Sequence, residues 1–263
     1  MPQKAWSSIQ KEAEKLVSEE PVLQALVHET ILNQPNLMCS LSAHLASKFA
    51  DNCMTSVAYD ALFREIMTED SSIVESAVAD LRAIKERDPA CDCYTIPFLY
   101  FKGFLAIQAA RVSHALWHQG REVMARHLQS RSSELFGTDI HPAAILGKGL
   151  FLDHATGFVV GETAVIGNDV SILHEVTLGG SGKETGDRHP KIGDGVLIGA
   201  GAKLLGNIEI GDGVKIGAGS VVLNDVRAHV TVAGVPAKVV GGTAHKNPSR
   251  FMEHTIDGPD YEI

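Results

Sequence analysis

The sequence predicts an α+β protein in which an N-terminal α-helical bundle is followed by a parallel β-helix and a mobile C-terminal tail. Three observations lead to this fold class. An aliphatic residue returns at every sixth position across residues 140–222, the preceding residues carry apolar side chains at helical spacing, and residues 241–263 are polar and contain Pro248 and Pro259. The predicted divisions are 1–136 for the helical oligomerisation domain, 137–240 for the β-helix and 241–263 for the flexible tail.

The six-residue repeat is visible in its aliphatic positions. They fall into three runs separated by two departures, and most are followed by glycine: Ile140, Leu146 and Leu152; Val160, Ile166, Ile172 and Leu178; Ile192, Ile198, Leu204, Ile210, Ile216 and Val222. Short strands joined by tight corners around a three-sided coil would bring one aliphatic residue per side inward, at about eighteen residues per coil. An ordinary sandwich or barrel is the alternative, but its turns fall at irregular intervals.

The residues before the repeat predict a series of helices. Apolar spacing and proline positions place them at 6–17, 21–31, 37–50, 56–67, 73–87, 97–118 and 121–136. A β-helix has open ends whose unpaired strand edges invite aggregation, so a preceding helical bundle is expected to cap it. After Val222 the repeat fades, and we expect Pro236 to end regular strand pairing.

Composition restricts the class of partner and the compartment. The formal net charge of −9 gives no reason to expect nucleic acid or an anionic membrane as partner. The sequence has no apolar run of membrane-spanning length and no apolar secretory segment near its start, which predicts a cytoplasmic protein. Its cysteines do not form two zinc-binding pairs, so we expect reduced thiols and no metal: Cys39, Cys53, Cys91 and Cys93.

The two departures from the repeat are the candidate functional loops, because function in repeat proteins is usually placed on such insertions. One lies at residues 153–157 and the other at 180–190. His154 in the first loop is a candidate general base, since an imidazole can take a proton from a hydroxyl near neutrality. A carboxylate is needed to orient it, and both Asp139 and Asp153 are candidates. The alternative is that His154 is a polar corner residue.

Several motifs, in this order, resemble the bacterial serine O-acetyltransferases, a family of hexapeptide-repeat acyltransferases. The motifs in the repeat are Asp-Ile-His-Pro-Ala-Ala at 139–144, Leu-Asp-His-Ala-Thr-Gly at 152–157, Val-Thr-Leu-Gly-Gly at 176–180 and Gly-Asp-Arg-His-Pro-Lys-Ile at 186–192, with further matches at 87–90 and 100–104. The resemblance implies a left-handed β-helix, although ordinary parallel crossovers are right-handed.

The same resemblance implies an activity. The family transfers acetyl from acetyl-CoA to the hydroxyl of L-serine, giving O-acetyl-L-serine and CoA for cysteine biosynthesis, with L-cysteine as feedback inhibitor. By resemblance, His154 is the catalytic base and Asp139 its partner, and the two meet at a cleft between subunits. The residues alone leave open which carboxylate pairs with the imidazole.

Substrate binding adds further candidates. Serine is a zwitterion, so its site needs carboxylates for the ammonium and cations for the carboxylate. Asp88 and Asp153 fit the first need, while Arg188 and His189 fit the second, in agreement with their family roles. The alternatives are a helix cap for Asp88 and a solvated loop charge for Arg188. The CoA-binding candidates are glycines and alanine with close backbone access, and lysines for the phosphates: Gly179, Gly180, Gly199, Ala200, Gly201, Lys203, Lys215 and Lys238.

The resemblance also implies partners. Family members form trimers of parallel coils, which the helical domains join into hexamers, and a C-terminal isoleucine enters the active site of O-acetylserine sulfhydrylase. Ile263 retains that terminal isoleucine; a tail without a role is the alternative. Three rival functions remain: a hexapeptide acyltransferase with another acceptor, a non-catalytic scaffold, and a zinc enzyme that would draw on the histidines His141, His154, His174 and His189.

Overall fold

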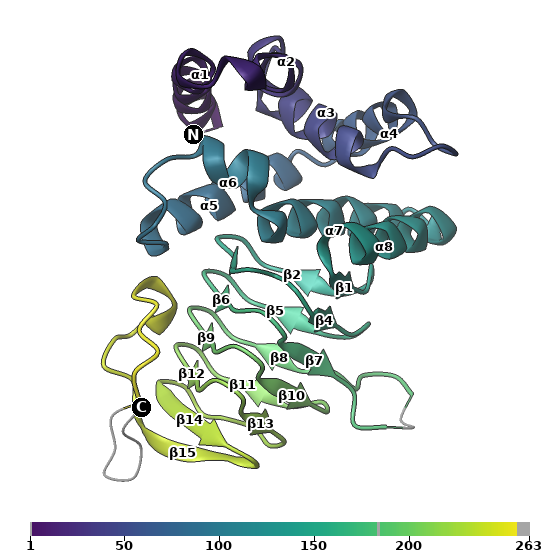
Figure 1. Ribbon diagram of the computed structural model, residues 1–263. Coiled ribbons are helices and arrows are strands. Elements are labelled where there is room, and N and C mark those ends of the chain that lie inside the picture. The colour runs from purple at the N-terminus through teal and green to yellow at the C-terminus, as the bar shows by residue number, and fades with distance from the viewer. Residues whose placement is uncertain (1, 183–184, 257–263) are drawn as a thin grey trace.

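The computed structural model describes residues 2–182 and 185–256, and it stacks a helical region on a prism of short parallel strands (Figure 1). None of the described helices is long and apolar enough to cross a membrane. The helices are α1 (Pro2–Glu19), α2 (Gln24–Val27), α3 (Leu37–Phe49), α4 (Ser56–Glu69), α5 (Ser72–Arg87), α6 (Thr95–Tyr100), α7 (Lys102–His118) and α8 (Glu122–Phe136).

Local sequence explains where several helices begin and end. The Asn36 side chain accepts a hydrogen bond from the Cys39 N–H at the start of α3, and Thr55 caps α4 in the same way. Gly137 ends α8 in the left-handed conformation, with φ of 68°, which a residue without a side chain adopts at low cost. The chain therefore turns from α8 directly into the first strand, β1 (Thr138–Ile140).

Two predicted helices are interrupted. The segment predicted as one helix from Pro21 is a 3-10 turn (Pro21–Leu23), the short α2 and a π-turn (His28–Leu32). The segment predicted as one helix over 97–118 is broken at Phe101, whose ψ of 103° is extended. The break sets α7 across the first coil, where Gly103 lies so close to the Leu152 carbonyl that an added Cβ would be 2.0 Å from its oxygen.

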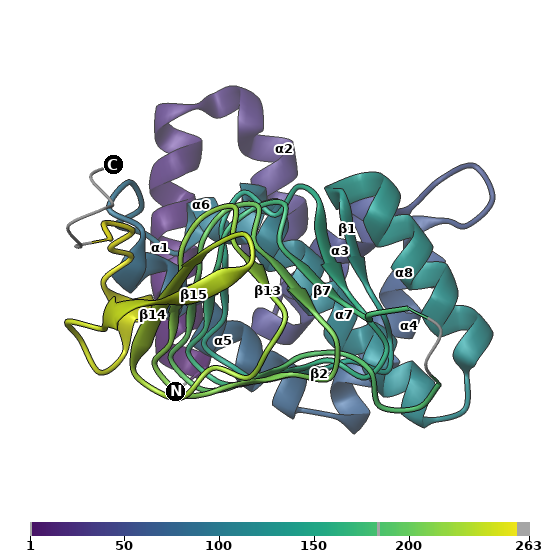
Figure 2. The same cartoon turned by 90° about the horizontal axis from the view of Figure 1, so that it is seen from below.

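The strands after β1 form the three faces of the prism, seen end-on in Figure 2. Sheet A contains β1, β4 (Phe158–Val160), β7 (Thr177–Gly179), β10 (Lys203–Leu205) and β13 (Val221–Val222); sheet B contains β2 (Ile145–Leu146), β5 (Val165–Ile166), β8 (Lys191–Ile192) and β11 (Glu209–Ile210). Sheet C contains β3 (Phe151–Leu152), β6 (Ser171–Ile172), β9 (Leu197–Ile198), β12 (Lys215–Ile216), β14 (Val230–Gly234) and β15 (Ala237–Gly242).

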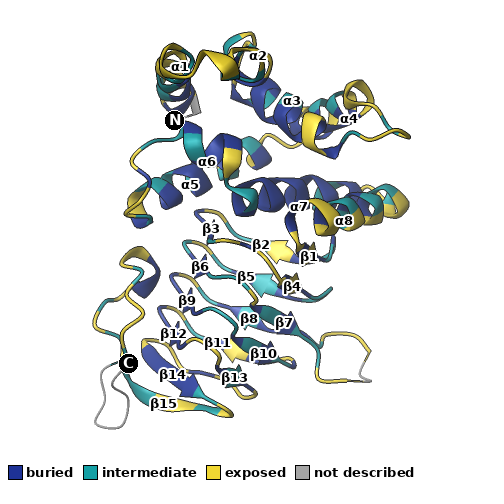
Figure 3. Cartoon of the chain, viewed as in Figure 1, coloured by how far each residue is buried: buried dark blue, intermediate teal, exposed yellow. Residues whose placement is uncertain are grey.

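Register confirms the repeat. In sheet A, Ile140 pairs with Val160, Val160 with Leu178 and Leu178 with Leu204, so the predicted aliphatic residues form one column. Sheets B and C align their own columns, for example Ile166 beside Ile192. These side chains form one buried cluster inside the coils. Figure 3 colours each described residue of the chain by its burial. The period of six therefore places one aliphatic residue per face inward, as predicted.

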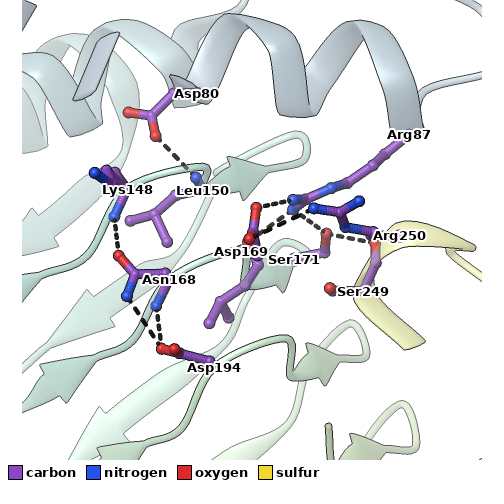
Figure 4. Close-up of polar contacts among 11 residues, drawn as sticks. Asp80, Arg87, Lys148, Leu150, Asn168, Asp169, Ser171, Asp194, Ser249 and Arg250 are labelled. Atoms are coloured by element: carbon purple, nitrogen blue, oxygen red, sulfur yellow. Dashed lines mark hydrogen bonds and ion pairs between the residues drawn. The ribbon is translucent and has the colours of Figure 1, made fainter. Parts of the chain in front are cut away.

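The helical region caps the first coil. Asp80 of α5 is fully buried and accepts hydrogen bonds from the Leu150 N–H at 2.8 Å and from Arg111 of α7 at 2.9 Å (Figure 4 shows the Leu150 contact). Arg111 in turn donates to the carbonyl oxygens of Leu146 and Gly147. Polar backbone groups at the open end of the prism are thus satisfied by side chains of the bundle, in line with the expected capping role.

The other end closes differently from the prediction. Pro236 does not end strand pairing: it follows a cis peptide bond at the turn between β14 and β15, which pair antiparallel. Beyond this hairpin the chain returns along sheet C (Figure 1). Ser171 Oγ donates to the Ser249 carbonyl at 2.9 Å, and Asp169 contacts both Arg87 and Arg250 (Figure 4). The described part of the predicted mobile tail, to residue 256, is therefore in contact with the coils and α5.

Candidate active site

The predicted site residues occupy two corners of the prism. The C–A corner is the set of turns that lead from sheet C into sheet A, at residues 153–157, 173–176, 199–202 and 217–220. The A–B corner is the set that leads from sheet A into sheet B, at 141–144, 161–164, 180–190 and 206–208. A strand of sheet A separates the two corners in each coil, and three extended residues span about 10 Å.

His154 lies at the C–A corner of the first coil. Its side chain is 74% exposed, and its Nε2 lies 3.8 Å from Asp153 Oδ2. His154 and Ala155 both have positive φ, at 58° and 61°, and such non-glycine conformations cost about 1–3 kcal/mol each and cluster at functional sites. The inward packing of Ala155, which is fully buried, holds the turn and leaves the imidazole outside.

One neighbour of His154, the histidine at 174, was named only for the zinc alternative and not for the acyltransferase site. The ring of His174, one coil further along the same corner, lies with its centroid 5.9 Å from that of His154 at an interplanar angle of 81°. Its Nδ1 is buried without a hydrogen-bond partner among the described residues. The six-residue register could have indicated this contact, because each position of one coil stacks on the corresponding position of the next.

Asp139 lies on β1 with its side chain exposed on the outer face of sheet A. Its Oδ1 accepts a hydrogen bond from Gln129 Nε2 of α8 at 2.7 Å. Within the described chain no hydrogen bond or ion pair joins Asp139 to His154, whereas Asp153 lies beside that imidazole. In a single chain, Asp153 is therefore the carboxylate adjacent to the predicted base.

Arg188 and His189 lie at the A–B corner, at the end of the long insertion. An Arg188 Nη donates a hydrogen bond to Glu162 Oε2 at 2.5 Å. Thr163 Oγ1 accepts hydrogen bonds from the backbone N–H of Arg188 at 3.0 Å and from that of His189 at 3.1 Å. Glu162 and Thr163 are site residues that the sequence reasoning missed. They fasten the insertion to the preceding coil and orient both predicted substrate ligands.

The hydrogen bonds of His189 assign its tautomer. Its Nδ1 accepts from the Thr163 N–H at 3.2 Å, so the proton of the neutral ring is on Nε2. Burial lowers the pKa of His189 below its usual value, and the charge of Arg188 lowers it further. His189 was predicted as a cation for a carboxylate, but at neutral pH these features make it a neutral N–H donor beside the cationic Arg188.

The charges of Asp139 and Arg188 both reach a third histidine. Both act electrostatically on His141 of the A–B corner, whose pKa is lowered mainly by burial, while the neighbouring Glu162 and Asp139 oppose that shift. The Glu162 carboxylate has a lowered pKa because it is hydrogen bonded to Arg188. The structure thus brings Arg188 and His189 to the A–B corner and Asp153 and His154 to the C–A corner, with Asp139 on the sheet A strand between the two corners of its coil.

Asp88 follows the last residue of α5. It is the C-terminal cap residue of α5 through its backbone N–H, which donates to the Ile84 carbonyl, in agreement with the alternative considered for this residue. Its Oδ1 accepts a hydrogen bond from the Ala90 N–H at 2.9 Å within the turn that follows the helix. The preceding residue, Arg87, is buried, and one of its guanidinium nitrogens donates a hydrogen bond to Ser171 Oγ of sheet C at 3.1 Å. Among the described residues, no hydrogen bond or ion pair joins Asp88 to Asp153.

The predicted CoA-binding residues are also divided between the corners. Gly179 and Gly180 lead into the A–B corner, and a Cβ on Gly180 would be 3.6 Å from His189 Nε2. The C–A corner contains Gly199, Ala200 and Gly201. A Cβ on Gly199 would be 2.6 Å from the backbone nitrogen of Ala218 in the next coil. The glycine at 199 is thus required by coil stacking.

The three predicted phosphate ligands differ in exposure. Lys203 Nζ contacts the Glu175 carbonyl, and Lys238 on β15 is exposed. Lys215 is only 9% exposed, and its ammonium contacts the Thr255 carbonyl of the returning tail. Lys215 can reach a phosphate only if that tail segment moves.

The histidines of the zinc hypothesis do not converge. His154 and His174 lie at the C–A corner, whereas His141 and His189 lie at the A–B corner. Among residues 2–182 and 185–256, no three side chains of histidine, cysteine, aspartate or glutamate are placed to hold a metal ion. Within the described part of one chain, these histidines therefore form no three-ligand metal site.

A coil of hexapeptide repeats with an exposed histidine at one corner and a polar insertion at another is typical of the hexapeptide-repeat acyltransferases. The family described as "Serine acetyltransferase, N-terminal" matches residues 5–109, and "Bacterial transferase hexapeptide (six repeats)" matches residues 189–224. The serine acetyltransferase of Escherichia coli (strain K12) is 53% identical over 253 residues, which cover 96% of this chain and 93% of that protein. The chain belongs to the serine acetyltransferase family.

Solved structures agree with this assignment. The serine acetyltransferase of Vibrio cholerae O1 biovar El Tor N16961 is 49% identical and superposes with a TM-score of 0.97, covering 98% of this chain and 100% of its own. A serine acetyltransferase in complex with cysteine is 49% identical, with a TM-score of 0.95 and coverage of 97% and 99%. The Brucella abortus strain S19 enzyme with coenzyme A is 52% identical, with a TM-score of 0.90 and coverage of 92% and 96%. The predicted fold class, a helical bundle followed by a left-handed parallel β-helix, is confirmed.

Proposed function

We propose that this chain transfers the acetyl group of acetyl-CoA to the hydroxyl of L-serine, giving O-acetyl-L-serine and CoA. The observation that carries the proposal is the division of the motif residues into two complementary sets. One corner presents the His154 base with Asp153, and the other presents the Arg188 cation with the His189 donor. Together they match a zwitterion that carries a reactive hydroxyl.

Neither set is sufficient alone, so we place the active site between subunits. A strand of sheet A separates the sets by about 10 Å, more than one serine can bridge. A trimer of parallel coils would set the C–A corner of one subunit against sheet A and the A–B corner of its neighbour. The proposed site then contains Asp88, Asp153 and His154 from one subunit, and Asp139, Arg188 and His189 from the next.

The proposed reaction is direct acyl transfer. His154 takes the serine hydroxyl proton while the serine oxygen attacks the thioester carbonyl, and Asp139 supports the imidazolium that forms. The tetrahedral oxyanion collapses, the carbon–sulfur bond breaks, and the CoA thiolate receives the proton from the imidazolium. Gly179, Gly180 and residues 199–201, which are Gly-Ala-Gly, would border the pantetheine arm. The phosphate ligands would be Lys203, Lys215 and Lys238.

The same site explains inhibition by L-cysteine. Cysteine carries the ammonium and carboxylate of serine, so it would bind Asp88, Asp153, Arg188 and His189 and exclude serine. Solved relatives have been crystallised with each amino acid: one structure is a complex with cysteine, and the soybean enzyme, 55% identical with a TM-score of 0.89, is complexed with serine. We therefore propose competitive feedback inhibition by cysteine.

The proposal extends to assembly and compartment. Joining of two trimers through the helical domains, residues 1–136, would give a hexamer. Ile263 would enter the active site of O-acetylserine sulfhydrylase; this residue lies outside the described part of the chain. The described cysteines are all free thiols, which supports a reducing cytoplasmic location. A pull-down with the sulfhydrylase, comparing the full chain with one lacking Ile263, tests the tail: equal capture would contradict it.

The activity is tested by thiol release from acetyl-CoA. We expect serine-dependent release that His154→Ala lowers by about 10²–10⁴ and that cysteine suppresses by competition with serine. Threonine and homoserine serve as comparison acceptors. If another acceptor supports turnover and serine does not, the acyltransferase assignment survives and the serine-binding roles of Asp88, Arg188 and His189 fail.

A further inference from the structure

We propose that Gln129 is a positioning residue that orients the Asp139 carboxylate for its partnership with the catalytic imidazole. This inference rests on the proposed function, in which Asp139 supports His154. It is carried by the contact between Gln129 Nε2 and Asp139 Oδ1 at 2.7 Å, which joins the helical domain to the outer face of sheet A. Gln129 lies on α8 and is not part of any of the repeat motifs.

The surrounding structure fixes this contact. Helix α8 packs along β1, with Leu128 and Ser132 buried on either side of Gln129 along the helix. Ser132 Oγ lies 3.3 Å from Thr138 Oγ1, which places a second polar contact between the helix and the strand next to Asp139. The left-handed Gly137 sets the angle between the two elements. Gln129 is therefore presented to Asp139 by rigid backbone on both sides.

The chemistry of a glutamine suits a positioning role. Its amide donates one hydrogen bond to Oδ1, which restricts rotation of the carboxylate, and leaves Oδ2 for an imidazole N–H. Because the donor is neutral, it does not neutralise the charge that must stabilise the imidazolium. The nearby cation does not compete for this carboxylate, since Arg188 is hydrogen bonded to Glu162 at 2.5 Å.

The first test compares Gln129→Met with a matched control. Methionine retains the length of the side chain and removes the donor, so we expect kcat to fall about tenfold, with the KM for acetyl-CoA unchanged. Gln119 makes a similar contact, from Nε2 to Glu69 Oε2 at 2.8 Å, far from the site on an exposed surface. Gln119→Met is expected to retain the wild-type kcat. Equal effects of the two substitutions would overturn the proposal.

A second test separates positioning from a structural effect. If Gln129 acts through Asp139, then Gln129→Met added to Asp139→Asn lowers kcat no further than Asp139→Asn alone. If Gln129 only supports the fold, the two losses multiply. Thermal denaturation of each variant reports any loss of folded enzyme.

The controls also distinguish the proposal from the activity itself. Serine-dependent turnover by the wild type with no effect of Gln129→Met overturns the role of Gln129 alone. Lack of serine turnover by the wild type overturns the proposed function first. A loss in Gln129→Met together with an unaffected Asp139→Asn would show that Gln129 does not act through Asp139.

Discussion

Replacing Asp80 with leucine should weaken the packing of the helical region on the first coil of the prism. The Asp80 carboxylate is 1% exposed and pairs with Arg111, which is 8% exposed, at 2.9 Å. It also accepts hydrogen bonds from Gln108 and from the Leu150 N–H. Asp80→Leu therefore leaves one buried guanidinium without a counter-charge and two buried donors without acceptors.

The expected loss follows from this burial. Removing one partner of a buried ion pair costs about 3–5 kcal/mol. For a chain of this length each kcal/mol lowers the melting temperature by roughly 2–4 °C, so Asp80→Leu should lower it by roughly 6–20 °C. The assay is thermal denaturation followed by circular dichroism at one fixed chain concentration, because assembly also affects the midpoint.

Two further variants make this prediction refutable. The Arg121–Glu65 pair has exposed fractions of 39% and 50%, so Glu65→Leu should cost less than about 1 kcal/mol. The double variant Asp80→Leu with Arg111→Met should regain part of the loss, because apolar replacement of both partners is often near neutral. If Asp80→Leu is no more harmful than Glu65→Leu, or if the double variant shows no recovery, the capping argument is wrong.

Three other predictions concern packing, pH and substrate binding. Gly103→Ala should lower the free energy of unfolding by about 1–3 kcal/mol or more, the cost of an overpacked core site, because its Cβ would be 2.0 Å from the Leu152 carbonyl oxygen. Gly241→Ala is the comparison in urea denaturation, because no atom lies within 4 Å of the added Cβ and Gly241 does not have a positive φ. Burial lowers the pKa of His44 to about 4, so the unfolded chain, with a value near 6.5, takes up its proton first as the pH falls. This contribution to stability is complete above pH 6.5 and decreases by roughly 3 kcal/mol towards pH 4; His44→Phe should flatten that part of the pH dependence. Arg188→Lys should raise the KM for serine about tenfold, with the KM for acetyl-CoA unchanged in steady-state kinetics, because a lysine ammonium does not present the several fixed donors of a planar guanidinium.

Much of the prism could be predicted because its information is local and periodic. Each aliphatic residue of the repeat faces inward for the same physical reason, so the register from Ile140 to Val222 follows from the spacing alone. The interruption at Phe101 could not be predicted in this way. It places Gly103 against Leu152, a residue of the first coil that lies far along the sequence, and local sequence patterns do not report such a contact.

The C-terminal region was harder to predict because its contacts are made by individual side chains. Pro236 indicated the end of pairing, yet it occupies the turn of an antiparallel hairpin, where its missing N–H is harmless. The polar composition of residues 241–263 indicated a mobile tail, although Ser249 and Arg250 contact Ser171 and Asp169. Composition does not show such contacts.

Some residues of the candidate site could be found from sequence motifs, and others depend on contacts made only in the fold. His154, Arg188 and His189 were identifiable from their motifs, whereas Glu162, Thr163 and Gln129 act through partners distant in sequence. Coil stacking could have indicated Thr163, since it lies one coil before the insertion. The contact of Gln129 depends on the angle at which α8 meets β1, and no sequence pattern states that angle.

The most direct test of the account is complementation between two inactive variants. His154→Ala and Arg188→Ala damage the two sets of residues that we assign to neighbouring subunits. When equal amounts are co-expressed, statistical assembly gives intact pairs of sets at about a quarter of the interfaces, so the mixture should regain about a quarter of the wild-type rate at a serine concentration where each variant alone is inactive. If the mixture stays as inactive as its components while mass measurements confirm mixed oligomers, the site lies within one chain and the proposed arrangement is wrong.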